Sequence, residues 1–154
     1  FANYMLGDAS NSRFHERIRE KEGLSYGVGS YLSASPFDKS GGFGAYAIQA
    51  PENIAKVETA FKEEIAKAAK EGFTEEKMKT SRSGIRESRQ LSRVEDRRLA
   101  SLLASYLYIG RTLTWDADFQ KKIDALTLPQ VQDALKKYID VSKISIYKAG
   151  SFKK

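Results

Sequence analysis

The first third of the chain contains two short stretches in which apolar and small residues alternate, a pattern that predicts an antiparallel pair of strands. These predicted strands cover residues 25–34 and 42–50, and the polar, glycine-containing segment between them predicts a long hairpin loop. Ahead of the strands, apolar and charged residues mix over residues 1–6 and 11–22, as is typical of short amphipathic helices. The sequence therefore predicts two short helices followed by a β-hairpin.

From Pro51 onward the apolar residues follow a helical period. One face of a predicted helix carries Ile54, Val57, Phe61, Ile65 and Ala68. Pro51 suits the first turn of this helix, and Gly72 suits the position just after its end. Thr74 then caps a second predicted helix that has two glutamates in its first turn. We expect this second helix to be long, with a break near Gly84 or Ser92.

The last third of the chain predicts two further helices and a closing strand. A helical stripe that we interpret as core is formed by Trp115, Phe119, Ile123 and Leu126. Thr127, followed three residues later by Gln130, is the signature of a capping box and begins the next helix. The segment KISIYKAG, residues 143–150, then alternates like a strand. Because strands and helices are segregated, the predicted class is α+β, a mostly antiparallel sheet with helices packed on one face.

Length and composition are those of a single domain over residues 1–154. The chain has 154 residues, of which 41% are hydrophobic, enough for one core. No apolar run is long enough to cross a bilayer, so we expect no contact with a membrane. The absence of cysteine excludes a disulfide framework.

Much of the positive charge, formally +6, lies on one helical face. Its arginines recur at steps of three or four residues: Arg82, Arg86, Arg89, Arg93 and Arg97. Such a stripe could bind nucleic acid or another anion, or could face a sister domain. However, no nucleic-acid module is recognisable, no aromatic residues interleave with the stripe, and Glu87, Glu95 and Asp96 lie close to it. A solvated or salt-bridged face is therefore favoured.

Residues 12–34 bring a guanidinium and a phenol to one helix-to-strand corner. Arg19 lies in the last turn of the predicted short helix, Gly23 suits the left-handed backbone that ends it, and Tyr26 opens the first strand. Leu24 is placed to fold back onto Ile18 and seal the turn. Taken alone, each side chain has an ordinary structural explanation, since a helix dipole favours a cation at this end and tyrosine is common in strands.

Four segments carry a family resemblance: ANYMLG, SRFHERIREKEGLSYGVGSYLSA, DKSGGFGAYAIQAP and GFTEEKMKTSRSGIRESR. They resemble consecutive parts of the C-terminal, non-zinc half of the insulinase/pitrilysin family of zinc peptidases, which includes the mitochondrial processing peptidases. In that family an arginine and a tyrosine at this spacing reach across a closed chamber to bind substrate near the scissile bond. The resemblance implies that role for Arg19 and Tyr26. It also implies that this chain lacks the family's first strand.

The zinc motif of that family is absent from the chain. A zinc peptidase needs three protein ligands, a bound water and a general base, which the family supplies through HxxEH and a distant glutamate. The one histidine, His15, is followed by Glu16, but Ile18 and Arg19 complete neither HxxEH nor HExxH. We therefore expect no catalytic residue, metal ligand or cofactor in this chain, and zinc in a partner domain or chain that bears HxxEH.

Three functions are compatible with these observations. The leading interpretation is a non-catalytic, substrate-binding half of a zinc metallopeptidase, which hydrolyses peptides or unfolded segments only together with its HxxEH-bearing partner. The second is a structural or assembly homologue of the same fold without a proteolytic role. The third is a basic module that binds nucleic acid or another anion. The likeness to bacterial two-part members suggests the periplasm or cell envelope.

Overall fold

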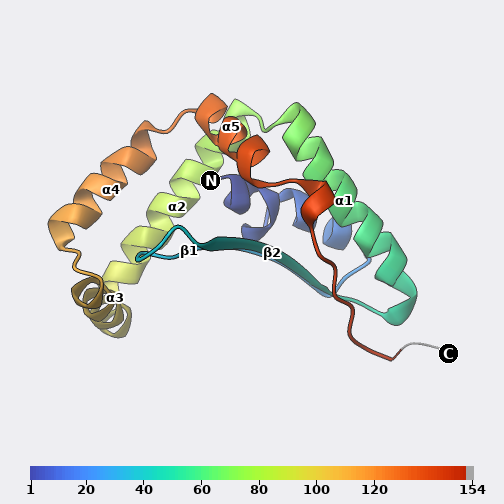
Figure 1. The fold of residues 1–154 in the computed structure, drawn as a ribbon, viewed down its shortest axis with the longest axis horizontal. Helices are drawn as coiled ribbons and strands as arrows, with labels where there is room; N and C mark the ends of the chain where they lie inside the picture. Colours follow the sequence, from blue (N-terminus) through green and yellow to red (C-terminus); the bar gives the residue numbers. More distant parts are fainter. Residues whose placement is uncertain (152–154) are drawn as a thin grey trace.

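The computed structural model of the chain describes residues 1–151 and contains a β-hairpin with helices over one face (Figure 1). Strand β1, Gly27–Ala34, pairs antiparallel with β2, Gly41–Ile48, in a register that sets Val28 opposite Ala47. Val28 is buried beneath the helices, whereas Tyr31 and Tyr46 lie exposed on the other face. The predicted α+β class, with an antiparallel sheet covered on one face, is confirmed.

The remaining elements are helical. Two short π-helices precede the hairpin, η1 at Tyr4–Asp8 and η2 at His15–Lys21. After the hairpin and a short 3-10 turn, η3 at Pro51–Asn53, come α1 Ile54–Glu71, α2 Glu75–Val94, α3 Asp96–Tyr108, α4 Leu113–Ala125, α5 Leu128–Tyr138 and the 3-10 turn η4 Val141–Lys143. None of the described helices is both long and apolar enough to cross a membrane.

The predicted helix ends are present. Gly72 ends α1 with a positive φ of 74°, the left-handed backbone that glycine adopts without strain. The Thr74 side chain accepts a hydrogen bond from the Lys77 N–H and begins α2. Thr127 and Gln130 form both hydrogen bonds of a capping box at the start of α5. These ends are local, which is why the sequence alone locates them.

The main core lies between the hairpin and the helices η1, η2, α1 and α5. Phe14, which directly precedes η2, is fully buried and meets the Phe61 ring of α1 edge to face, with ring centroids 4.7 Å apart. Ile18 of η2 and Leu135 of α5 are buried in the same cluster, together with Val28 of β1. This packing fixes η2 against both α1 and the hairpin, so the polar faces of η2 have defined positions.

A helix break was expected near Gly84 or Ser92; the alternative at Gly84 is wrong, and the break lies three residues beyond Ser92. Helix α2 continues to Val94, and the chain turns at Glu95, whose backbone is extended. Gly84 lies inside the helix, and its packing explains why a glycine is present there. A methyl group at this position would overlap the hydroxyl of Tyr4 in η1. The glycine therefore lets η1 approach α2.

The predicted closing strand over residues 143–150 is also wrong. Residues 144–149 form no strand, and Ile146 and Tyr147 are exposed. The segment is tied to α1 instead, because Lys148 pairs with Glu58 at 2.6 Å. An alternating pattern needs a neighbouring strand for its ladder, and the described hairpin does not extend to this segment.

The aromatic stripe of α4 was predicted to be part of the core, and this prediction is wrong. Trp115 is half-buried and stacks on Phe119, which is exposed, with ring centroids 5.1 Å apart. The buried residue of α4 is the neighbouring Asp116. Helix α4 packs against α2 through charged side chains, so its apolar stripe faces partly outward.

Candidate functional site

The turn between η2 and β1 has the backbone that the sequence predicted. Gly23 has a φ of 60°, in the left-handed region, and its place directly after η2 lets the chain reverse. The Leu24 N–H donates a 2.8 Å hydrogen bond to the Ile18 carbonyl, and both side chains are buried in the core. The end of η2 and the start of β1 are therefore held at a fixed angle.

The strand side of the turn is fixed as well. The Tyr26 N–H donates to the carbonyl of Ile48 at 2.8 Å, which extends the hairpin ladder by one residue. The buried Ser25 hydroxyl lies 2.8 Å from the same carbonyl and accepts a hydrogen bond from the Gly27 N–H at 3.2 Å. The backbone that carries the Tyr26 phenol is thus held by bonds on both sides.

Arg19 and Tyr26 both lie exposed at this corner. Arg19 is on the surface of η2, and 78% of Tyr26 is accessible to solvent. Among residues 1–151, neither side chain takes part in a hydrogen bond or an ion pair. The structure therefore leaves a guanidinium and a phenol beside one turn, both available to a ligand.

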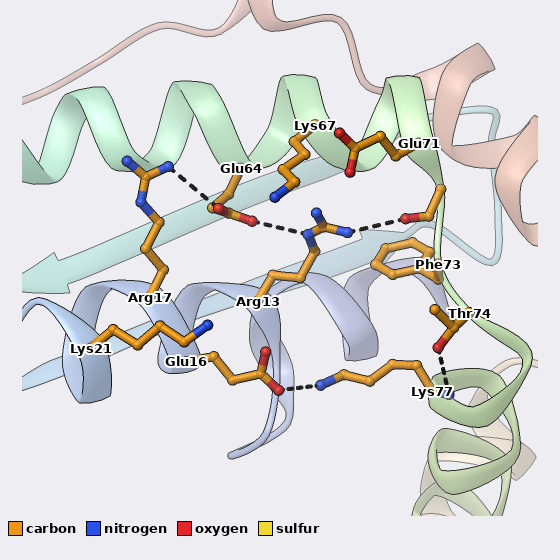
Figure 2. A pocket seen from close by; sticks show the side chains of 11 residues that line it. Arg13, Glu16, Arg17, Lys21, Glu64, Lys67, Glu71, Phe73, Thr74 and Lys77 are labelled. Carbon is orange, nitrogen blue, oxygen red and sulfur yellow. Dashed lines mark hydrogen bonds and ion pairs between the residues drawn. The ribbon is translucent and has the colours of Figure 1, made fainter.

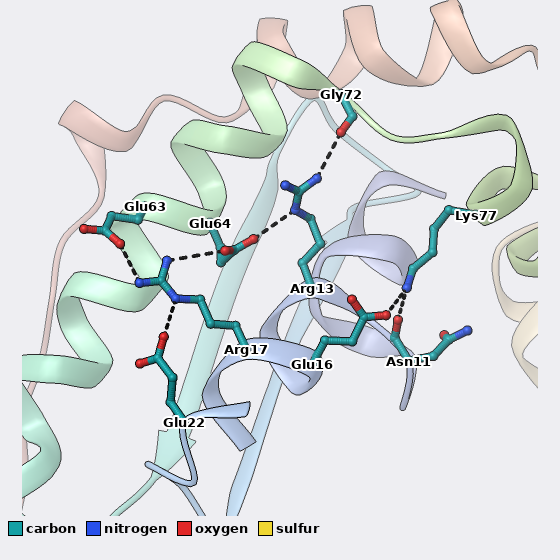
Figure 3. A network of polar contacts seen from close by, with 9 residues as sticks. All are labelled: Asn11, Arg13, Glu16, Arg17, Glu22, Glu63, Glu64, Gly72 and Lys77. Carbon is teal, nitrogen blue, oxygen red and sulfur yellow. Dashed lines mark hydrogen bonds and ion pairs between the residues drawn. The ribbon is translucent and has the colours of Figure 1, made fainter. Parts of the chain in front are cut away.

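Arg17, on another face of η2, and Arg13, just before η2, are fully engaged (Figure 3). Arg17 binds Glu22 at 2.8 Å, Glu63 at 2.5 Å and Glu64 at 3.3 Å. Hydrogen bonds to Glu22 and Glu63 raise the pKa of Arg17 above its ordinary value. Arg13 holds the other oxygen of the buried Glu64 at 3.0 Å. This network was not predicted from the sequence, although the four-residue spacing of the two arginines and the adjacent pair Glu63 and Glu64 were a signal.

A groove of about 400 Å³ lies between η2, the second half of α1 and the start of α2 (Figure 2). Its lining is strongly charged and consists of Arg13, Glu16, Arg17, Lys21, Glu64, Lys67, Glu71, Gly72, Phe73, Thr74 and Lys77. Lys77 closes one side through an ion pair with Glu16 at 2.5 Å. Neither Arg19 nor Tyr26 lines this groove.

No group of three or more His, Cys, Asp or Glu side chains comes together as a possible metal site within residues 1–151. His15 is partly buried, and its Nδ1 lies 3.0 Å from the Ser12 hydroxyl. This contact gives the His15 ring a polar partner within the chain. The described residues do not provide the three ligands that a peptidase zinc requires.

Comparison with known proteins assigns the family. The model of the Peptidase M16 inactive domain family matches residues 1–85, which include η1, η2, the hairpin and α1. The chain belongs to this family. The resemblance drawn from the sequence segments is thereby confirmed.

Relatives of this M16 inactive domain include an uncharacterized zinc protease of Rickettsia bellii, 36% identical over 88 residues, which are 57% of this chain and 21% of the relative. The non-peptidase homolog YmxG of Helicobacter pylori is 24% identical over 98% of the chain and 34% of its own length. The crystal structure of a peptidase M16 inactive domain from Pseudomonas fluorescens matches 92% of the chain and 34% of its own, with a TM-score of 0.75 and 24% identity. The chain thus spans about a fifth to a third of these proteins.

The arginine stripe of this M16 domain is directed at α4. The Arg82 guanidinium donates to the carbonyls of Ile123, Asp124 and Leu126 at 2.6 to 2.8 Å, where α4 ends. Arg86 pairs with the Asp124 carboxylate at 3.0 Å. Cations are favourable at the carboxyl end of a helix, so both side chains stabilise the contact between α2 and α4.

Further along the same face, Asp116 of α4 is the centre of the contact. It accepts hydrogen bonds from Arg89 and from the Tyr106 hydroxyl, each at 2.6 Å, and from Arg93. Burial alone would raise the pKa of Asp116, but the hydrogen bonds from Tyr106 and Arg93 and the charge of Arg89 hold it below its ordinary value. Three arginines of the stripe, Arg86, Arg89 and Arg93, are therefore salt-bridged, and Arg82 is held by backbone carbonyls. A salt-bridged face was favoured from the sequence, and this leaves little of the stripe for nucleic acid.

Proposed function

We propose that this M16 inactive domain is the substrate-binding half of a zinc metallopeptidase and acts together with a partner domain or chain that bears HxxEH. The supporting observation is the contrast among the arginines of η2 and of the residues just before it. Arg13 and Arg17 are bound by carboxylates, whereas Arg19, beside Tyr26 at the locked turn, has no partner in residues 1–151. An unpaired guanidinium held by a rigid element is suited to binding an extended peptide.

In this proposal Arg19 and Tyr26 have different roles. The Arg19 guanidinium holds a carbonyl of the bound peptide, which positions the scissile bond. The Tyr26 hydroxyl donates to the carbonyl oxygen as water adds and negative charge develops there, so this hydrogen bond strengthens in the transition state. Zinc, water and the general base belong to the partner in this proposal.

Substitution at the corner tests the proposal. The chain is mixed with its HxxEH-bearing partner, and cleavage of an extended peptide is measured for wild type, Arg19→Ala and Tyr26→Phe. Loss of a donor to the developing charge lowers turnover by about 100-fold. Arg97→Ala and Tyr138→Phe, which alter exposed residues on other helices, serve as matched controls and leave cleavage unchanged. Full activity of both corner variants would refute the assigned roles.

A structural role without proteolysis is the second candidate function. It is favoured by the likeness to a relative named a non-peptidase homolog, which extends over 98% of the chain. The two candidates differ in one measurement. If the chain only supports assembly, its partner forms a complex with it but cleaves peptides at the same rate with and without Arg19 and Tyr26.

We propose that the protein is located in the bacterial periplasm or cell envelope. The relatives described above are all bacterial, which agrees with this proposal. Fractionation of the source cells, followed by detection of the full-length protein, tests this location. Recovery with the cytoplasmic fraction would contradict it.

A further inference from the structure

The groove between η2, α1 and α2 has more positive than negative charge. Five basic side chains and three acidic side chains line it, a formal balance of +2. Its arginines are already bound to Glu64, and Lys77 is bound to Glu16. In Figure 2 the Lys67 side chain points from α1 into the gap toward η2, and the Lys21 side chain runs along η2. Within residues 1–151 neither of these lysines has an acidic partner.

We propose that this groove binds carboxylates of an acidic peptide segment, with Lys21 and Lys67 as the groups that contact them. The two ammonium groups are held on opposite walls, one on η2 and the other on α1. A carboxylate between them gains two charge-assisted hydrogen bonds without disturbing any existing ion pair. The proposal concerns a different face from Arg19 and Tyr26 and does not depend on their role.

The floor of the groove favours a peptide over a small ion. Phe73 is buried to 93%, lines the groove and lies 5.9 Å from the Arg13 guanidinium. The small part of this residue that remains exposed offers a limited apolar surface to the methylene groups of a glutamate or to a neighbouring peptide side chain. A ligand that combines a carboxylate with short apolar groups therefore matches both parts of the lining.

The same geometry disfavours phosphate. Arginine binds phosphate through paired donors, which a lysine lacks, and the guanidinium groups of Arg13 and Arg17 are occupied by carboxylates. Glu64 and Glu71 also line the groove and repel a dianion more than a monoanion. What remains free is a pair of ammonium groups, which suits a single negative charge.

Fluorescence anisotropy with a labelled peptide of alternating glutamate and alanine tests the proposal on the 154-residue chain. We expect the double variant K21Q/K67Q to bind this peptide about fivefold to tenfold more weakly than wild type, as for two partly exposed ion pairs. The double variant K122Q/K136Q removes the same charge from exposed lysines of α4 and α5 and retains wild-type affinity. Circular dichroism verifies that each variant is folded. Equal weakening by both double variants would show net-charge attraction only and overturn the proposal.

Two further peptides locate the carboxylate. One has every glutamate replaced by glutamine, and the other has an amidated C-terminus. Loss of binding with the first assigns the site to acidic side chains, and loss with the second assigns it to the terminal carboxylate; either result supports the proposal. Unchanged binding of both peptides would overturn it. Displacement of the acidic peptide by inorganic phosphate, but not by acetate at equal ionic strength, would also overturn it.

Discussion

Within η2, neighbouring arginines have opposite environments. Arg17 contacts three carboxylates, whereas Arg19, two positions later, projects from a different side of the helix and contacts none in residues 1–151. Side chains two positions apart project from nearly opposite sides of a helix, so the pairing of one arginine with α1 excludes the other from it. The difference between a structural and a ligand-binding arginine is thus set by helical phase.

Gly23 and Gly27 make a matched test of the corner. A Cβ at either position meets no atom within 4 Å, but only Gly23 has a positive φ. We expect Gly23→Ala to lower the free energy of unfolding by about 1–2 kcal/mol, because a side chain is strained in the left-handed region. Gly27→Ala leaves it unchanged or raises it by up to about 1 kcal/mol, because alanine restricts the unfolded chain. Urea denaturation measures both.

Equal destabilisation by the two alanine variants would show that the positive φ of Gly23 does not determine the loss of unfolding free energy. Peptide binding by Gly23→Ala gives a second readout, since an altered turn moves Arg19 relative to Tyr26. The strain and the displacement are therefore measured separately.

The corner could be predicted from the sequence because its determinants are adjacent in the chain. Gly23, Leu24 and Ile18 lie within one turn of each other and define the reversal by local rules. The network of Arg13 and Arg17 with Glu64 could not be derived with the same certainty, since it joins residues 47 and 51 positions apart. Such pairs depend on how η2 packs on α1, which only the folded chain determines.

At the scale of elements, α2 and α4 are joined by charge. Asp116 is buried and accepts bonds from two arginines of α2 and from Tyr106 of α3. Breaking a buried ion pair leaves the remaining charges without compensation. We therefore expect Asp116→Asn to lower the free energy of unfolding by about 2–4 kcal/mol at neutral pH.

The contribution of Asp116 depends on pH in a defined direction. Its folded-state pKa lies below the ordinary value of 3.8, so the ionised carboxylate stabilises the fold at pH values above 3.8. This stabilisation is lost as the pH falls through the folded-state pKa. The difference in unfolding free energy between wild type and Asp116→Asn should thus be constant from about pH 7 to 5 and shrink in more acidic solution.

Asp118→Asn is the control for this pH dependence. Asp118 is on the same helix but exposed, with a single ion pair to Lys121 at 3.0 Å, so its substitution costs less than about 1 kcal/mol at any pH. A difference for Asp116→Asn that does not change with pH would contradict the assignment of the depressed pKa to this carboxylate.

The contacts of α2 and α4 also show what the sequence patterns did not predict. The arginine spacing correctly predicted a face of α2 for Arg82, Arg86, Arg89 and Arg93, whereas Arg97 lies on α3, beyond the turn at Glu95. The spacing did not say what that face contacts. The stripe with Trp115 and Phe119 predicted burial, yet the contact of α4 with α2 uses Asp116 on an adjacent face. A helical period of apolar residues indicates that their face is buried only when the facing helix is also apolar. Here the facing helix, α2, presents guanidinium groups.

At the scale of the whole molecule, the chain is a fraction of the proteins it is similar to. It spans 21% of the zinc protease of Rickettsia bellii and 34% of the structure from Pseudomonas fluorescens. The closing segment, predicted as a strand, remains without a ladder partner among the described residues. Long-range strand pairing depends on the complete sheet, so it could not be derived from the alternation of this segment alone.

Dependence on a partner is the prediction at this scale. We expect the isolated chain to retain no stoichiometric zinc after dialysis and to leave an extended peptide uncleaved, because a peptidase zinc needs three protein ligands. Addition of an HxxEH-bearing partner should restore both zinc and cleavage to the mixture. Elemental analysis and peptide hydrolysis measure the two quantities. One zinc per isolated chain would contradict the assignment of the metal to the partner.

The side chain of Tyr4 packs against Gly84 and so connects the first helix, η1, to the middle of the longest described helix, α2. A glycine inside a helix costs about 1 kcal/mol relative to alanine, yet alanine here would push the phenol outward. Positions 4 and 84 consequently restrict each other: a larger residue at one is tolerated only with a smaller residue at the other. During evolution the two would be replaced as a pair, although 79 residues lie between them.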